Sequence, residues 1–369
     1  MTISDHPVHG LVTIRLIGAP PSVLRSIERI FGPASADSTA DPDVVVSFTD
    51  ALETRGRLRF LGLRDAAFDA DAFYVVDAAG RRSRLDFETL GQRTEIVCER
   101  GVRSVPLLLA VVGLRLLRKG YVLLHSCAFR FRDQGTIVCG WQKGGKTEML
   151  LAFMAAGAEY VADEWTILAA DGTSVYGLPG IVQVWGWHLR ELPELSARLT
   201  RRERARMGAL RSFQRLYHGL PRVPDPSGFP GDVLQRLSLE GGNSLVGQVR
   251  APAERLFGDR IARTRISLDR VFLATSSDSP TSIERVAGGE IAARMAASLS
   301  WERRRLLAAY DQFRFAFPDR SSSWVEQATA TERTLLANAL APHVAHELTH
   351  PYPVPLRELF DVAAPLYAA

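Results

Sequence analysis

Residues 140–147 read Gly140-Trp141-Gln142-Lys143-Gly144-Gly145-Lys146-Thr147 and fit the pattern G-x-x-x-x-G-K-[ST] at every fixed position. The apolar run Thr136–Cys139 before them is typical of a strand, and Lys146–Ala156 has the pattern of a helix. Glycines let the backbone wrap closely around an anion, and the free N–H groups at the start of a helix point towards it. The stretch therefore predicts a phosphate-binding loop, although a glycine-rich turn could match the pattern by chance.

Lysine is rare in this chain, and two of its three lysines lie in this loop. Only Lys119, Lys143 and Lys146 occur among 45 lysines and arginines. A GC-rich genome is the simplest explanation for the excess of arginine. Where arginine is the usual basic residue, a lysine indicates a need for a compact ammonium group in place of a planar guanidinium. We expect Lys146 to reach the β- and γ-phosphates of a nucleotide and the Thr147 hydroxyl to ligate Mg²⁺.

Acidic residues follow the next predicted strand. Glu159–Ala162 has a strand pattern and leads directly into Asp163 and Glu164. A nucleoside triphosphate site needs a carboxylate near its metal ion, at the end of a neighbouring strand. This acidic pair could supply it, and the simpler alternative is a solvated turn. His125 lies in the predicted strand Tyr121–Phe131, where it could face the transferred phosphate or be an ordinary core residue.

The order of these segments resembles the catalytic core of HPr kinase/phosphorylase. The resemblance covers roughly residues 123–180 and rests on four pieces: Leu124-His125-Ser126-Cys127-Ala128, the loop, the helix that ends in Ala156-Gly157, and Val161-Ala162-Asp163-Glu164. Val175-Tyr176-Gly177-Leu178-Pro179-Gly180 is a plausible continuation. The segments are also similar to related kinases of lasso-type peptide pathways and, more remotely, to ATP-dependent phosphoenolpyruvate carboxykinase. No convincing copy is found of the second signature with which the HPr enzyme docks its protein substrate.

The resemblance implies a mixed α/β fold with a P-loop kinase core of this type, and a phosphotransferase that uses ATP and Mg²⁺. Carried over by residue, His125 lies at the reacting phosphate, Asp163 is base or metal ligand, and Glu164 is metal ligand. The family has two aspartates here, so the longer Glu164 leaves the division of roles open. The expected catalytic residues are His125, Asp163 and Lys146, and the expected metal ligands are Thr147, Asp163 and Glu164. Nucleotide contacts are expected from Gly140, Gln142, Lys143, Gly144, Gly145, Lys146, Thr147 and Glu148.

The rest of the chain divides at about residue 100. Residues 1–100 show short strands and one amphipathic helix, Ser22–Phe31, and predict a small α+β domain for packing or substrate docking. Residues 101–369 predict the catalytic domain, with a helical C-terminal part. Helices are expected at Val105–Leu117, Leu189–Tyr217, Gly289–Phe315, Thr331–Leu348 and Leu356–Ala363, and a strand at Ile266–Ala274.

Other motifs have simpler explanations than function. His346-Glu347-Leu348-Thr349-His350 spells the zinc-protease motif H-E-x-x-H, but Pro351 follows at once, and the end of a packing helix is the better account. Arg260, Arg263 and Arg265 are candidates for an arginine clamp on the phosphates. The run Arg201–Arg206 could dock an acidic peptide or form a solvated helix face, and Pro221–Gly231 could close as a loop over the acceptor.

Composition narrows the class of protein. The net charge of +4 comes from nearly balanced charges and does not favour nucleic acid, and no apolar run is long enough to span a membrane. Cys98, Cys127 and Cys139 have no metal-like spacing, so a cytoplasmic protein without disulfides is expected. The leading hypothesis is a kinase for a hydroxyl, preferably a serine of a peptide or protein. A small-metabolite kinase, a nucleotide-binding regulator without transfer, and homo-oligomerisation stay open.

Overall fold

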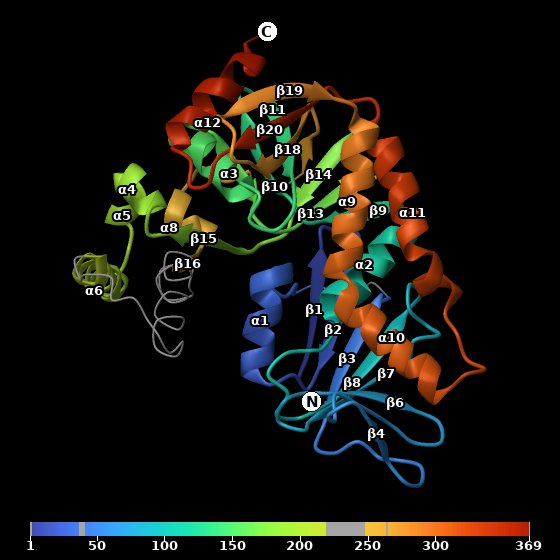
Figure 1. Cartoon of the computed structure of the whole chain (residues 1–369). Coiled ribbons are helices and arrows are strands. Elements are labelled where there is room, and N and C mark those ends of the chain that lie inside the picture. Colours follow the sequence, from blue (N-terminus) through green and yellow to red (C-terminus); the bar gives the residue numbers. More distant parts are fainter. Residues whose placement is uncertain (1, 37–40, 219–247, 263–264, 369) are drawn as a thin grey trace, which may run out of the picture.

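The computed structural model describes residues 2–36, 41–218, 248–262 and 265–368 and shows a mixed α/β protein (Figure 1). An eight-stranded sheet formed near the N-terminus makes up one end of the molecule, and a six-stranded sheet with helices on both faces makes up the other. The predicted loop Pro221–Gly231 and Arg263 lie outside the described residues. No helix in the described part of the chain combines the length and the apolar character that crossing a membrane requires.

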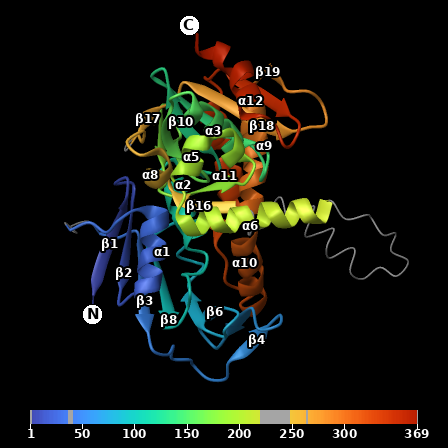
Figure 2. The same ribbon diagram turned by 90° about the vertical axis from the view of Figure 1, so that its left-hand side faces the viewer.

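Residues 3–99 supply all strands of the eight-stranded sheet. In spatial order they are β1 (Ile3–Val8), β2 (Val12–Ile17), β3 (Val44–Thr49), β8 (Thr94–Glu99), β7 (Arg82–Leu85), β6 (Phe73–Val76), β5 (Ala66–Phe68) and β4 (Arg59–Leu61). Ile14 and Leu16 of β2 point to one face and share a core with Val23 and Ile27 of helix α1 (Pro21–Phe31). Figure 2 shows α1 beside the first strands. This helix confirms the prediction made from its amphipathic pattern.

The six-stranded sheet carries the glycine-rich loop. Its order is β12 (Glu159–Ala162), β10 (Cys127–Phe131), β11 (Gln134–Cys139), β18 (Arg270–Ser276), β20 (Ala345–His350) and β19 (Ser282–Val286). Successive residues of β11 face two different cores: Ile137 and Cys139 join the core of the N-terminal sheet, and Val138 joins a second core on the opposite face. Helices α3 (Lys146–Ala155) and α12 (Leu356–Ala363) cover that opposite face.

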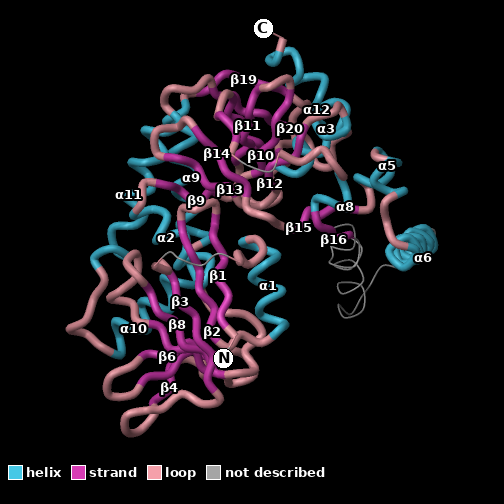
Figure 3. The backbone as a smooth tube through the Cα atoms, turned by 180° about the vertical axis from the view of Figure 1, so that it is seen from behind, coloured by secondary structure: helices cyan, strands magenta, loops and turns pink. Residues whose placement is uncertain are grey.

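The remaining elements connect and cover these sheets. A third sheet is ordered β17 (Ile266–Ser267), β14 (Ser174–Gly177), β13 (Thr166–Ala169) and β9 (Tyr121–Leu124), and β15 (Ile181–Trp185) pairs with β16 (Gln248–Pro252). The other helices are α2 (Leu108–Arg118), α4 (His188–Glu191), α5 (Pro193–Ala197), α6 (Arg201–His218), α8 (Ala253–Phe257), α9 (Gly288–Glu302), α10 (Arg304–Ala316), α11 (Ser323–Leu340) and a 3₁₀ helix at Ala364–Tyr367. Helix α10 packs against β5 and β6, so a late part of the chain covers the N-terminal sheet (Figure 3).

Several secondary-structure predictions are wrong in part. The helix predicted at Thr331–Leu348 ends at Leu340, and the following residues form strand β20. The strand predicted at Tyr121–Phe131 is interrupted at His125-Ser126, because β9 and β10 pair into different sheets. The strand predicted at Ile266–Ala274 splits into β17 and β18 for the same reason. The single helices predicted at Leu189–Tyr217 and Gly289–Phe315 break into α4, α5 and α6 and into α9 and α10.

The strand directions bring the candidate site together. Strand β10 is antiparallel to both β11 and β12, so β11 and β12 point the same way. The loop after β11 and the acidic pair after β12 therefore lie at one edge of the sheet, next to the residues that precede β10. Strand β20 is parallel to β18, which is parallel to β11, so the last residue of β20 reaches the same edge. The topology thus gathers His125, the loop, Asp163 and His350.

Candidate active site

The loop between β11 and α3 requires glycine where the helix begins. Gly145 has a φ of 104°, and a Cβ built there would lie 2.0 Å from the Nε2 atom of His350. The same Nε2 atom lies 3.2 Å from the carbonyl oxygen of Gly144. Lys143 also has a positive φ, 60°, which is uncommon for a residue with a side chain. His350, buried at the end of β20, therefore supports the loop from within the fold.

Gly145→Ala is expected to destabilise the protein. The added Cβ would clash with the buried imidazole, and alanine at this positive φ adds about 1–2 kcal/mol of backbone strain. We expect the free energy of unfolding, measured by chemical denaturation, to fall by about 2 kcal/mol or more. Gly289→Ala is the matched control, because a Cβ there meets no atom within 4 Å. Equal stability of the two variants would contradict this description of the loop.

Lys146 and Thr147 begin α3, immediately after the loop. The Lys146 side chain is buried, and its ammonium donates to the carbonyl oxygens of Gly140 and Trp141 at 3.1 and 2.8 Å. Burial lowers the pKa of this lysine. The Thr147 hydroxyl donates to Oδ1 of Asp163 at 3.0 Å. The structure therefore brings the lysine and the hydroxyl of the motif together with the acidic pair that follows β12.

Asp163 and Glu164 have different environments. Asp163 is 2% exposed, and burial together with the neighbouring charge of Glu164 raises its pKa to about 7. Its Oδ2 atom is buried and has no hydrogen-bond partner among the described residues. Glu164 has a φ of 89°, and its contact with His125 lowers its pKa. The pair therefore combines a carboxyl group that titrates near neutral pH with one that stays ionised there.

His125 lies between two carboxylates in the interruption that separates β9 from β10. Its Nδ1 atom lies 2.8 Å from Oε1 of Glu302, and its Nε2 atom lies 3.6 Å from Oε2 of Glu164. The Trp165 ring stacks on the imidazole, with the ring centres 5.1 Å apart. Burial lowers the pKa of His125, but the two carboxylates raise it by more, so the net shift is upward. This arrangement favours the protonated imidazole.

Glu302, the last residue of α9, belongs to the site although no local pattern marks it. The Oε1 atom that contacts His125 also accepts a hydrogen bond from the Gln142 amide at 2.8 Å. Glu302 thereby links the glycine-rich loop to the histidine. Nothing in the sequence near residue 302 points to this role, because its two partners lie far away along the chain. Only the packing of α9 beside the sheet edge reveals it.

The structure restricts what two of the predicted residues can contribute through their side chains. The Glu148 side chain is buried and lies 3.3 Å from Nε2 of His188, so only its backbone is available to a nucleotide. Arg260 donates to the carbonyl oxygen of Met154 near the C-terminal end of α3, away from the loop, and is therefore not a phosphate clamp. Arg265 is exposed, as is Lys143.

The H-E-x-x-H motif lies on strand β20 rather than at the end of a helix. Side chains four residues apart on a strand are about 13 Å apart, too far to bind one ion together. His346 stacks on Phe272, while His350 lies against the glycine-rich loop. Among the residues that the structure describes, no group of three or more histidine, cysteine, aspartate or glutamate side chains is arranged to hold a metal ion. On a strand, the spacing of the two histidines does not give the paired zinc ligands that a zinc peptidase uses.

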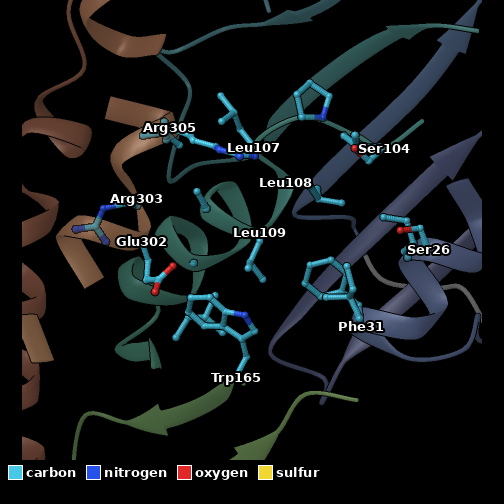
Figure 4. A pocket seen from close by; sticks show the side chains of 18 of the residues that line it. Ser26, Phe31, Ser104, Leu107, Leu108, Leu109, Trp165, Glu302, Arg303 and Arg305 are labelled. Atoms are coloured by element: carbon cyan, nitrogen blue, oxygen red, sulfur yellow. The ribbon is translucent and has the colours of Figure 1, made fainter. Parts of the chain in front are cut away.

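Trp165 lines two neighbouring cavities. A polar cavity of about 310 Å³ is lined by Asp163, Glu164 and Gln183, and the Gln183 amide donates to Oε1 of Glu164 at 2.8 Å. An apolar cavity of about 370 Å³ lies between α1, α2 and the junction of α9 with α10, and Glu302 is one of its lining residues (Figure 4). Helix α1 contributes to both cavities. The N-terminal region therefore reaches the edge where the acidic pair lies.

Comparison with protein-family models and with curated proteins assigns no family to the chain. No protein-family model matches the chain, and no curated protein matches it. What the site can do chemically must therefore follow from its own residues and contacts.

Proposed function

We propose that this protein is a kinase that uses ATP and Mg²⁺ to phosphorylate a hydroxyl group. The observation that carries the proposal is the hydrogen bond from Thr147 to Asp163 beside the glycine-rich loop. It joins the hydroxyl of the motif to a buried carboxylate whose second oxygen has no partner among the described residues. Lys146 lies close enough to Asp163 for their charges to interact, and it supplies the positive charge for the phosphates.

The finer fold assignment is part of the same proposal. We assign residues 101–369 to a P-loop kinase core of the HPr kinase/phosphorylase type. The order of strand, loop and helix supports this, as does the position of the acidic pair at the end of β12. His125 precedes β10 at the same edge, and this position supports the role that the resemblance implies for it.

The oxygen atoms at this edge suit a magnesium ion. Mg²⁺ prefers oxygen ligands and is usually held by one or two carboxylates together with substrate phosphates. The free Oδ2 of Asp163 and the Thr147 hydroxyl are such ligands, and Glu164 follows directly. Because a buried carboxylate oxygen without a partner is unfavourable, a cation there would relieve an existing cost. When bound, Mg²⁺ supplies neutralisation of the phosphate charge.

The side chains also suit the transfer step. The acceptor hydroxyl gives its proton to Asp163 while its oxygen bonds to the γ-phosphorus, and the bond from that phosphorus to the β–γ bridging oxygen breaks to release ADP. Burial and the charge of Glu164 favour the protonated form of the Asp163 carboxyl group, which helps it to take up this proton. Lys146 and protonated His125 offset the negative charge on the transferred group. Glu164 and Glu302 raise the pKa of His125 and so favour its charged form.

The preferred acceptor is a serine of a peptide or protein, and a small metabolite with a hydroxyl is the alternative. Support for a docking role of residues 1–100 comes from the contacts they make near the site. Helix α1 lines the polar cavity, and Nε2 of His9 lies 2.7 Å from the carbonyl oxygen of Gly177. An acceptor in that cavity would touch both parts of the chain.

The direct test is transfer of the labelled γ-phosphate of ATP to serine peptides and small hydroxyl compounds with Mg²⁺ present. We expect a phosphorylated product with the wild type and transfer slower by about 100-fold or more with Lys146→Ala or Asp163→Asn. Lys119→Ala is the matched control, because Lys119 pairs with Asp43 far from the loop. Transfer that survives both site substitutions would refute the assigned site. Nucleotide binding without any product would favour a regulator instead.

Glu302 is expected to position His125 rather than to touch the substrates. Glu302→Gln removes one of the two charges that raise the pKa of His125, so this pKa should fall. We expect transfer to slow by about 10-fold, which corresponds to a loss of about 1.4 kcal/mol of transition-state stabilisation. Histidine titration by NMR and a pH–rate profile measure the two effects. Glu290→Gln at the half-exposed start of α9 is the control, and an unchanged His125 titration in Glu302→Gln would contradict the prediction.

A further inference from the structure

We infer that the acceptor carries a negatively charged group, a carboxylate or a phosphate, close to the hydroxyl that is phosphorylated, and that Arg29 and Arg250 bind this group in the polar cavity. This inference rests on the proposed function and names the chemical class of its second substrate. The cavity is the one of about 310 Å³ beside Asp163 and Glu164.

The polar cavity is the place where an acceptor hydroxyl has to lie. A general base must be within hydrogen-bond reach of the proton that it removes, and Asp163 is part of the cavity wall. The cavity volume is at the lower end of the range found for small-molecule sites. It therefore suits a single amino-acid residue or a small metabolite, and whatever lies close to the acceptor hydroxyl contacts the lining side chains.

Two arginines from distant parts of the chain line this cavity. Arg29 lies in the last turn of α1 and Arg250 lies in the middle of β16. Both side chains are exposed, and neither forms an ion pair or a side-chain hydrogen bond with another described residue. They are therefore free to bind an anion without first giving up a partner within the described part of the chain.

The strand register places Arg250 beside the acidic pair. Arg250 is the cross-strand partner of Gln183, so their side chains lie on the same face of the β15–β16 ribbon. Gln183 in turn donates to Glu164. Only the Gln183 side chain therefore separates Arg250 from Glu164 of the acidic pair.

Arg29 approaches the cavity from the N-terminal region. The turn that ends α1 lies close to the part of the cavity wall formed by Pro179, since a Cβ at Gly32 would lie 3.8 Å from the Pro179 ring. Guanidinium groups bind carboxylates and phosphates with two parallel N–H donors. Asp163 and Glu164 alone would repel an anionic acceptor. The two arginines offset this repulsion and hold the charged end of the acceptor so that its hydroxyl faces Asp163.

Binding of matched acceptor pairs tests the inference, using protein saturated with a non-hydrolysable ATP analogue and Mg²⁺. The members of each pair differ in the charged group: serine and serinamide, a tripeptide ending in serine as free acid and as amide, and glycerol 3-phosphate and glycerol. We expect at least one charged member to bind about 10-fold or more tightly than its neutral partner, as measured by calorimetry. The pair that shows this preference identifies the source of the anion.

Substitution of the arginines completes the test. Arg29→Ala and Arg250→Ala should each weaken the charged member by about 10-fold while leaving the neutral member and the ATP analogue unchanged. Arg25→Ala is the matched control, because Arg25 is exposed on α1 but does not line the cavity. Equal or absent binding of both members in all three pairs, or arginine variants that weaken only the ATP analogue, would overturn the inference. Failure of the wild type to bind the analogue at all would instead refute the proposed function.

Discussion

Replacing Asp163 with asparagine is expected to slow phosphoryl transfer by about 10²–10⁴-fold, because the acceptor hydroxyl loses its general base. Asparagine keeps an oxygen for the Thr147 hydroxyl, so the hydrogen bond that wild-type Asp163 accepts at 3.0 Å can persist. A single-turnover assay of phosphorylated product measures the loss. A variant that transfers phosphate at the wild-type rate would remove Asp163 from the proposed chemistry.

The same substitution should change how stability depends on pH. The pKa of Asp163 rises from 3.8 to about 7 on folding, so between these values the folded protein holds a proton that the unfolded chain has released. Wild-type stability therefore falls as pH increases through this window, by up to about 1.4 kcal/mol per pH unit. Asparagine lacks this dependence, so Asp163→Asn should gain stability relative to the wild type from pH 4 to pH 7. Parallel pH profiles of unfolding without nucleotide would contradict the buried, protonated carboxyl group.

Lys146→Ala is expected to lower kcat/KM for ATP by about 10²–10³-fold, because one charged donor to the transferred phosphate is lost. Lys146→Arg should not restore the activity, since the 7% exposed site leaves little room for a planar guanidinium. Steady-state kinetics with MgATP measure both variants against Lys119→Ala. Near-normal kinetics in Lys146→Ala would show that this ammonium does not bind the phosphates.

Local sequence patterns are sufficient to predict the parts of the site that follow one another along the chain. Strand β12 begins and ends at the predicted residues, and α3 begins at the predicted Lys146, because short apolar runs there are bounded by glycines and acidic residues. The same patterns locate the loop and Asp163. Each of these features depends on neighbours within a few residues, which is the range over which periodicity and turn residues carry information.

The parts of the site that could not be predicted from the sequence depend on contacts between distant segments of the chain. Glu302 reaches His125 only because α9 packs beside the sheet edge, and His350 reaches Gly144 only because β20 joins the parallel strands. The break between α9 and α10 falls at Arg303, whose side chain pairs with Glu332 of α11 inside the core. No motif or regular residue spacing in the sequence identifies these residues as partners.

The sequence contains a signal against one of the wrong secondary-structure predictions, the helix at Thr331–Leu348. Helix α11 ends at Leu340, two residues before Pro342, and a proline disfavours helical geometry in the residue before it. A predicted helix that continues to Leu348 contains this proline in its interior. The residues from Ala345 onward instead form β20, whose alternating burial is set by pairing with β18 and β19.

The most direct test of the proposed site is a crystal structure of the protein with a non-hydrolysable ATP analogue and Mg²⁺. We expect the triphosphate to lie along residues 140–147, with Lys146 turned from its own loop carbonyls towards the phosphates. Thr147 and Asp163 should ligate the metal ion. An analogue bound elsewhere, or a loop that stays closed on the Lys146 ammonium at saturating nucleotide, would contradict the proposed kinase.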